Sequence, residues 1–435
     1  MPRAGTKSAL LGVIVTVALA GCGGGGGSTT GGQPGAGISQ ARAVDWPYFG
    51  RVPERTRFLT DAPDPPFSFG WVFFAHQLIE FPPALAGDEM FVVNKAGGVY
   101  AVRTSDGKVR WKRDLGNVVT GPAYAGGLVY VAQLGGGMVA LDASTGKQRW
   151  AFHPPGKLES SPLPVGGKVY LGSDAGTLWA LDAGTGKVAW KRDLGAPIKA
   201  SPSDHAGVVY VGDYHGRIHA LSATDGDPRW TRATGSSGFY SSPAIAFGRV
   251  YEARADGVLF ALTLDGHPAW RFTASNDIYS SPAVGDVSGT GPTVFIGSYN
   301  HQLYALDAAD GRKRWSYDIG GQIPGSPVVV GTTVYTSSFE TQTTVGLDAV
   351  NGKPVWKWGS AGYEPMVTDG DRVFLTGFQT VWAFDECTPP TEAPASGGKS
   401  GGPGSIPVCH RSADLHLVDV SRALRLDRPV PSAAR

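Results

Sequence analysis

The sequence predicts an all-β protein: an eight-bladed β-propeller built from four-stranded antiparallel blades. Three observations support this prediction. A strand–turn–strand unit that ends in a tryptophan recurs along the chain, its period is close to 40 residues, and one further tryptophan strand precedes the first full repeat. A fixed period of this length, with strand patterning throughout, is typical of propellers.

The repeating unit is clearest at residues 180–190. Ala180-Leu181-Asp182 has the pattern of a strand end, the glycine-containing stretch up to Gly186 has hairpin-turn chemistry, and the next strand carries Trp190. Successive copies place tryptophans 39, 40, 40, 40, 45 and 41 residues apart, at Trp111, Trp150, Trp190, Trp230, Trp270, Trp315 and Trp356. Two further strand signals precede each unit, so each period supplies four strands.

Each blade opens at a proline, which gives eight openings at Pro83, Pro122, Pro162, Pro202, Pro243, Pro282, Pro327 and Pro365. The eighth period ends at Asp385 without a tryptophan strand. Trp71 stands 40 residues before Trp111 in a strand that has no blade before it. We therefore expect the strand around Trp71 to complete the last blade of a propeller spanning residues 67–386, which removes the last exposed sheet edge.

Residues 1–22 resemble a bacterial lipoprotein signal peptide. A basic start is followed by an apolar run, Ala9 to Ala20, that is too short to span a bilayer. The run ends in Leu19-Ala20-Gly21-Cys22, and the resemblance implies lipidation of Cys22 after cleavage. An ordinary secretory peptide with a chance cysteine is the alternative. Residues 23–44 would then form a flexible, glycine-rich tether.

The segments that flank the propeller are less informative. Residues 45–66 form an aromatic lead-in, expected to pack on one face of the ring, with a ligand lid as the alternative. Residues 387–409 form a Pro/Gly-rich loop that a disulfide between Cys387 and Cys409 would close, because paired cysteines outside the cytoplasm usually bond. Two free thiols are the alternative there. The tail, residues 410–435, has no assignable structure.

One blade carries an insertion that resembles a degraded calcium loop, from Gly285 to Gly291. A calcium site needs several oxygen ligands at alternating positions. Asp286 is the one carboxylate in this stretch. We therefore expect a long turn and assign no metal ligand. Charged residues make up 17% of the chain and the net charge is +1, which indicates no attraction to nucleic acid.

The unit Ala-x-Asp-x-x-Thr-Gly-x-x-x-Trp, present at residues 140–150 and 180–190, resembles the tryptophan-docking motif of the pyrroloquinoline quinone (PQQ) repeat family. The resemblance covers residues 67–386. It implies that Trp71, Trp111, Trp150, Trp190, Trp230, Trp270, Trp315 and Trp356 wedge between neighbouring blades. Two branches of that family have eight blades, namely the quinoprotein dehydrogenases and the BamB-like lipoprotein scaffolds of outer-membrane barrel assembly.

The dehydrogenase branch implies features that this sequence lacks. Those enzymes hold calcium through a Glu, an Asn and an Asp, use an Asp as base, and carry a disulfide between adjacent cysteines. The three cysteines here are not adjacent, and no motif offers the ligand trio. We therefore assign no catalytic residue and no cofactor. PQQ with calcium stays an alternative without motif support.

Loops that meet around the central channel are the natural place for a binding site. The connections leading into the blades supply Glu80, Glu159, Lys199, Tyr240, Tyr279 and Glu364. Together with the loops between second and third strands, they predict a binding mouth whose densest part is Asp213, His215, Tyr240, Arg254, Tyr279, Tyr299 and His301. Aromatic residues beside Arg and His suit a peptide or a polar small molecule. Solvated loops without a ligand are the alternative.

Taken together, these patterns favour a non-catalytic, lipid-anchored, extracytoplasmic scaffold that binds a protein or peptide at the cell envelope. The anchor would hold it at the cell membrane, or at the outer membrane in a cell that has one. A PQQ-dependent oxidoreductase, or a degenerate relative of one, is the first alternative. A binder of a small molecule or a cell-wall polymer is the second.

Overall fold

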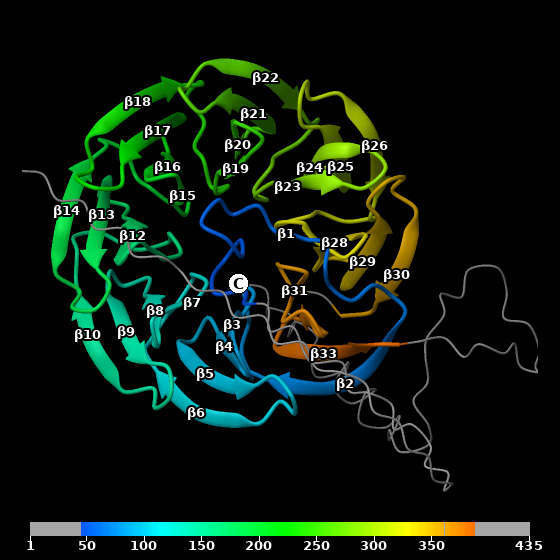
Figure 1. The fold of residues 1–435 in the computed structure, drawn as a ribbon, viewed down its shortest axis with the longest axis horizontal. Helices are drawn as coiled ribbons and strands as arrows, with labels where there is room; N and C mark the ends of the chain where they lie inside the picture. The colour runs from blue at the N-terminus through cyan, green and yellow to red at the C-terminus, as the bar shows by residue number, and fades with distance from the viewer. Residues whose placement is uncertain (1–44, 361, 388–435) are drawn as a thin grey trace, which may run out of the picture. The chain divides into compact units, whose positions relative to one another are not determined.

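The computed structural model of the chain describes residues 45–360 and 362–387, which form a ring of eight β-sheets around a central axis (Figure 1). The predicted eight-bladed propeller is therefore confirmed. The predicted signal peptide with Cys22, the tether, Cys409 and the tail lie outside the described residues. Within the described ranges, the structure contains no helix able to cross a membrane.

Each blade is a four-stranded antiparallel sheet whose first strand lies nearest the axis. Blades 1 to 4 comprise β3 (Ala84–Ala86), β4 (Glu89–Val93), β5 (Gly98–Arg103) and β6 (Val109–Asp114); β7 (Ala123–Ala125), β8 (Leu128–Ala132), β9 (Met138–Asp142) and β10 (Gln148–Phe152); β11 (Leu163–Val165), β12 (Lys168–Gly172), β13 (Thr177–Asp182) and β14 (Val188–Asp193); and β15 (Ser203–His205), β16 (Val208–Gly212), β17 (Arg217–Ser222) and β18 (Pro228–Ala233).

Blades 5 to 7 comprise β19 (Ala244–Ala246), β20 (Arg249–Arg254), β21 (Val258–Thr263) and β22 (Pro268–Thr273); β23 (Ala283–Val287), β24 (Gly291–Gly297), β25 (Gln302–Asp307) and β26 (Lys313–Asp318); and β27 (Val328–Val330), β28 (Thr333–Ser338), β29 (Thr343–Asp348) and β30 (Pro354–Trp358). The insertion in blade 6 lengthens β23 and β24 and the turn between them. Blade 8 comprises β31 (Met366–Thr368), β32 (Arg372–Thr376), β33 (Thr380–Glu386) and β2 (Phe67–Phe74).

The N-terminal strand closes the ring, as the sequence predicts. β2 pairs antiparallel with β33, and Trp71 lies opposite Ala383 in the register. The blade thus gains its outer strand from the opposite end of the chain, which leaves no gap in the circle of sheets.

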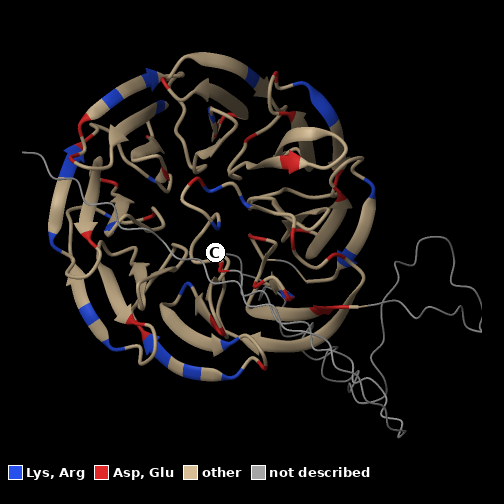
Figure 2. Cartoon of the chain, viewed as in Figure 1, with Lys and Arg blue, Asp and Glu red and all other residues tan. Residues whose placement is uncertain are grey.

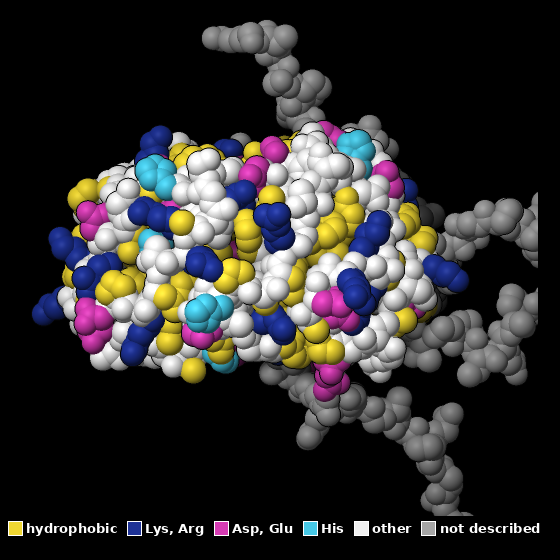
Figure 3. Space-filling model, turned by 90° about the horizontal axis from the view of Figure 1, so that it is seen from above, with side chains coloured by type: hydrophobic (Ala, Val, Ile, Leu, Met, Phe, Trp, Pro, Cys, Tyr) yellow, Lys and Arg dark blue, Asp and Glu magenta, His cyan; other side chains and the backbone are white. Residues whose placement is uncertain are grey.

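Burial changes from the inner to the outer strands. The second and third strands are buried on both faces, because each blade packs between two others; in β4, Met90, Phe91, Val92 and Val93 are all buried. On the outermost strands the tryptophan is the main core residue, as in β6, where Trp111 alone is buried. Many Lys and Arg residues lie on these outer strands (Figure 2), and on the side of the molecule seen in Figure 3 their side chains are spread rather than gathered.

The repeated tryptophans lie in the seams between blades. Seven of them donate an indole N–H to a backbone carbonyl in the turn of the next blade, over 2.6–3.2 Å, as Trp190 does to Ala223. Each of these rings also lies against a glycine of that turn. The eighth seam differs: the Trp356 ring packs edge-on against Phe67 and Phe384 of blade 8. Indole burial thus supplies much of the contact between sheets.

The lead-in does not pack over a face of the ring as expected but fills the centre of the ring. We call residues 46–59 the plug. Its backbone is hydrogen-bonded in turn to the innermost strands of six blades, through Leu85, Tyr124, Asp204, Ile245, Val284 and Val329. The plug ends in β1 (Phe58–Leu59), which pairs in parallel with β27. One extended segment therefore provides hydrogen-bond partners for backbone groups on the inner edges of these short strands, which would otherwise be unpaired.

Two fully buried arginines hold the plug in shape. The Arg55 guanidinium donates to the carbonyl oxygens of Pro202 (2.7 Å), Ser161 (3.4 Å) and Phe49. Arg57 donates to the Arg55 carbonyl over 3.0 Å, and its guanidinium lies 4.1 Å from the centre of the Phe49 ring. Burial lowers the pKa of Arg55 to about 9 and that of Arg57 to about 10.

Candidate binding site at the centre of the ring

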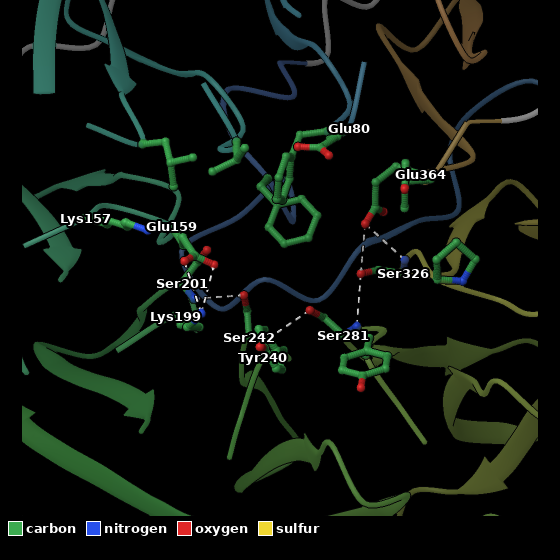
Figure 4. A pocket seen from close by; sticks show the side chains of 17 residues that line it. Glu80, Lys157, Glu159, Lys199, Ser201, Tyr240, Ser242, Ser281, Ser326 and Glu364 are labelled. Atoms are coloured by element: carbon green, nitrogen blue, oxygen red, sulfur yellow. Dashed lines mark hydrogen bonds and ion pairs between the residues drawn. The ribbon is translucent and has the colours of Figure 1, made fainter. Parts of the chain in front are cut away.

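A cavity of about 510 Å³ lies over the plug, and we call it the cup (Figure 4). Its volume is in the range of small-molecule and short-peptide sites. Connections leading into the blades supply most of its wall, while Phe49 of the plug forms part of its base. The cup is lined by Phe49, Glu80, Phe81, Val119, Leu134, Lys157, Glu159, Lys199, Ser201, Tyr240, Ser242, Tyr279, Ser281, Pro324, Ser326, Tyr363 and Glu364.

An arc of serine hydroxyls, which we call the serine ladder, runs along the base of the cup. Its members are the residues before the blade-opening prolines, namely Ser161, Ser201, Ser242, Ser281 and Ser326. The hydroxyl oxygen of each accepts the backbone N–H of the equivalent residue one blade earlier, over 2.9–3.2 Å. Figure 4 shows four of them in an arc. The ladder ties adjacent blades together close to the axis.

The ladder ends at Glu364, which replaces serine in blade 8. Oε1 of Glu364 accepts both the backbone N–H (3.1 Å) and the hydroxyl (3.2 Å) of Ser326. Desolvation by burial raises the pKa of Glu364 to about 7, although the charge of Arg57 and the bonds from Ser326 act in the opposite direction. Burial therefore favours the protonated form of this carboxyl group more than it is favoured in a solvated glutamate.

The other charged groups of the wall are mostly paired. The ammonium of Lys199 lies 3.1 and 3.3 Å from the two carboxylate oxygens of Glu159. The same ammonium lies over the rings of Tyr214 and Tyr240, at 5.3 and 5.4 Å from their centres. Glu80 pairs with Lys95 over 2.7 Å.

A row of four tyrosines runs along the loops of blades 4 to 6, and two of the four line the cup. Neighbouring ring centres in the row Tyr214, Tyr240, Tyr279 and Tyr299 are 5.2, 5.3 and 4.8 Å apart. The Tyr214 and Tyr240 hydroxyls are hydrogen-bonded over 2.7 Å. Half-buried tyrosines that hold one another in place present a rigid, amphipathic contact surface.

The structure brings only part of the predicted mouth to the cup. Tyr240 and Tyr279 line it, and Tyr299 continues the tyrosine row. His215 is exposed and His301 is half-buried, and both lie on loops outside the cup lining.

Two residues of the predicted mouth serve the loops instead. Asp213 is fully buried, where it accepts from Arg217 (2.6 Å) and contacts His219 (2.9 Å). Arg254 is 9% exposed and pairs with Asp256 over 2.8 Å. Both side chains therefore stabilise the loops to which they belong.

Some of the other cup residues are not predicted from the sequence, and some are. The plug residue Phe49 and the serine ladder have no local signature of binding, although the recurring Ser-Pro dipeptide was visible in the sequence. The sequence predicts four further mouth residues outside the densest group, namely Glu80, Glu159, Lys199 and Glu364. All four line the cup.

The fold and the cup define a tryptophan-docked propeller with a plugged centre and a binding-sized cavity over the plug. The chain belongs to the family described as outer membrane protein assembly factor BamB, whose profile matches residues 71–132, 95–204 and 183–388.

Individual relatives agree with this assignment. BamB of Escherichia coli strain K12 is 38% identical over 104 residues, which are 22% of this chain and 26% of that protein. The matched segments span only about a quarter to a third of the curated relatives' lengths, 26–34%.

Solved structures share the fold. BamB from Moraxella catarrhalis superimposes with a TM-score of 0.60 at 20% identity, over 74% of this chain and 98% of that one. The quinohemoprotein alcohol dehydrogenase from Comamonas testosteroni gives a TM-score of 0.65 at 17% identity, over 82% and 83% of the two chains. At such identities the likeness concerns the fold alone.

The dehydrogenase likeness prompts the question of whether the cup suits PQQ with calcium. A calcium ion needs several convergent oxygen ligands. Here Glu80, Glu159 and Glu364 are each engaged by a different neighbour. Across residues 45–360 and 362–387, no three His, Cys, Asp or Glu side chains gather as a metal site would need. The described residues of the cup therefore offer no ligand cluster for calcium.

Proposed function

We propose that this protein is a non-catalytic, lipid-anchored scaffold that binds a protein partner in the cell envelope. The observation that carries the proposal is the cup, whose wall combines rigid tyrosines with paired charges. Such surfaces suit the recognition of a peptide segment, because aromatic anchors and fixed polar groups contribute most to protein interfaces. Membership of a family of outer membrane assembly factors supports a partner from the same compartment.

A site-specific crosslinking experiment tests this proposal. A photoreactive amino acid replaces Tyr279 in the cup or, as control, Val109, which is 47% exposed on the outer strand β6. After irradiation of intact cells, we expect a discrete crosslinked protein from position 279 and none from position 109. Identical products from both positions, or none from either, would contradict a partner in the cup.

Quinone-dependent oxidation is tested separately, since the dehydrogenases share the fold. We expect titration of the purified protein with PQQ and Ca²⁺ to leave the absorbance spectrum of PQQ unchanged. A saturable spectral change, together with reduction of a dye by an alcohol, would replace the scaffold proposal with an oxidoreductase.

A further inference from the structure

We propose that the base of the cup is a carboxylate-binding site, and that its ligand is a carboxylate on a peptide segment of the partner. The carboxylate would come from a chain terminus or from an Asp or Glu side chain. This inference deepens the proposed function and rests on it, because it names the chemical group of the partner that enters the cup.

The donors are three hydroxyls of the serine ladder. Ser201, Ser242 and Ser281 line the cup and are only 4%, 2% and 3% exposed. Each hydroxyl oxygen accepts a backbone N–H, which leaves the hydroxyl proton to be donated. Among the described residues, none accepts a hydrogen bond from these three hydroxyls. Buried donors that face a cavity are best satisfied by an acceptor inside it.

The protein itself shows how the ladder binds a carboxylate. At the last rung, Ser326 donates its N–H and its hydroxyl to one oxygen of Glu364. The other three cup serines have the same place in their blades, and each stands before a blade-opening proline. A ligand carboxylate over Ser242 would therefore receive the kind of hydroxyl bond that Glu364 already receives.

The charges around the base favour an anion. Arg55 and Arg57 lie within the plug, and both guanidinium groups donate hydrogen bonds to backbone carbonyl oxygens. Two of the Arg57 nitrogens are buried without a hydrogen-bond partner among the described residues. The Arg57 guanidinium lies 4.1 Å from the centre of the Phe49 ring, and Phe49 lines the cup, so a positive charge lies close behind the base. Exposed Lys157 adds a further ammonium at the wall.

The negative groups of the wall oppose an anion less than their number suggests. Glu159 is neutralised by Lys199 and Glu80 by Lys95. Glu364 carries only a partial charge near neutral pH, because burial raises its pKa to about 7. These pairings and the raised pKa of Glu364 reduce the negative charge that an entering carboxylate would meet.

The tyrosines select what accompanies the carboxylate. Tyr240 and Tyr279 each stand two residues before a cup serine, so one connection presents both a hydroxyl and a ring to the cavity. Lys199 covers the faces of Tyr214 and Tyr240, which leaves these rings unsuited to stacking on a sugar. An apolar side chain next to the carboxylate fits this wall better.

Three synthetic pentapeptides test the site by calorimetry with the purified protein. They are acetyl-Gly-Ala-Gly-Ala-Phe with a free carboxylate, the same peptide as its C-terminal amide, and the amide with Asp as third residue. We expect at least one carboxylate peptide to bind about tenfold more tightly than the neutral amide, as a charged hydrogen-bond set implies. Tighter binding of the peptide with the free C-terminal carboxylate would indicate recognition of a chain end. Tighter binding of the amide peptide that contains Asp would indicate recognition of a side chain.

A matched pair of variants assigns the effect to the cup. Ser242→Ala and Ser161→Ala each remove one ladder bond, but only Ser242 lines the cup. We expect Ser242→Ala to lower the affinity for the carboxylate peptide about tenfold and to leave the affinity for the amide peptide unchanged. Ser161→Ala should change neither affinity. Lys157→Met, on the exposed wall, provides a second variant should Ser242→Ala fail to fold, and it should weaken the same peptide.

Equal affinities of carboxylate and amide peptides would overturn the inference, as would equal losses in the two serine variants. The outcome is separable from that of the scaffold proposal. If crosslinking at position 279 succeeds and the peptides show no carboxylate preference, the scaffold proposal is supported and the carboxylate-site proposal is wrong. If crosslinking fails and the preference is found, the site stands as one for a free peptide.

Discussion

The indole nitrogen of Trp150 lies 3.0 Å from the carbonyl oxygen of Ala183, a residue of the following blade. The ring is 8% exposed and packs beside Tyr130 at a centre distance of 5.8 Å. We expect Trp150→Ala to lower the free energy of unfolding by about 3–5 kcal/mol, because it empties a packed seam. Chemical denaturation measures this loss.

Trp150→Phe is the control for the seam. It keeps an aromatic ring and loses the indole hydrogen bond, so its cost should be markedly smaller than that of the alanine variant. Equal losses in both variants would show that the hydrogen bond, rather than the packed ring, holds the blades together.

The glycine that receives the ring gives a second prediction. A Cβ atom on Gly186 would lie 2.5 Å from the Trp150 ring, whereas a Cβ on Gly167 of the same blade would meet no atom within 4 Å. Both glycines have positive φ, +70° and +75°. Gly186→Ala and Gly167→Ala should therefore share a backbone cost of about 1–2 kcal/mol, and only the first should add about 1–3 kcal/mol from the clash.

The comparison of these two thermal or chemical unfolding curves isolates the contact with the ring. Matching stabilities of the two variants would mean that the turn moves away from the indole without cost, and that the seam is looser than the structure indicates.

The buried carboxyl of Glu364 makes stability depend on pH. Its pKa rises from 4.5 to about 7 in the folded protein, so the folded state holds the proton more tightly than the unfolded one. The stabilisation is complete below pH 4.5 and is lost as the pH rises through 7. We expect this loss to be about 3 kcal/mol across that window.

The measurement is the free energy of unfolding of the wild type relative to Glu364→Gln at several pH values. The glutamine side chain does not titrate, so the difference should shift in favour of the variant between pH 4.5 and 7. A difference that is flat with pH would indicate an ordinary, solvated carboxylate.

The lipid anchor is tested through the first cysteine. Acyl chains contribute about 0.8 kcal/mol of membrane affinity for each buried CH₂ group. Cys22→Ser should therefore move the protein from the membrane fraction to the soluble extracytoplasmic fraction and abolish labelling by a fatty acid. Cys409→Ser is the matched control, and it should leave both the fraction and the label unchanged.

The fold was predictable because its information is local and repeated. Each copy of the turn before Trp190 or Trp150 carries the hairpin signal and the residues that receive the preceding indole. The missing strand was predictable from arithmetic alone, since Trp71 stands one period before Trp111 and pairs with Ala383 in the structure.

The site was less predictable because its parts are remote from one another in sequence. Tyr240 and Tyr279 were identified because they stand in connections that must reach the axis. The plug was missed because its partners are spread over six blades, as in the bond from Val329 to Arg57, 272 residues apart. Asp213 was misjudged because sequence order does not reveal that Arg217 turns back onto it.

The pairing of β2 with β33 has a consequence for biosynthesis. The strand containing Trp71 emerges early and waits for a partner 312 residues downstream, at Ala383. Contacts so distant along the chain form late and slowly. A nascent polypeptide therefore keeps an open ring, accessible to proteases and chaperones, until Glu386 has been synthesised, and a polypeptide that terminates earlier never closes the ring.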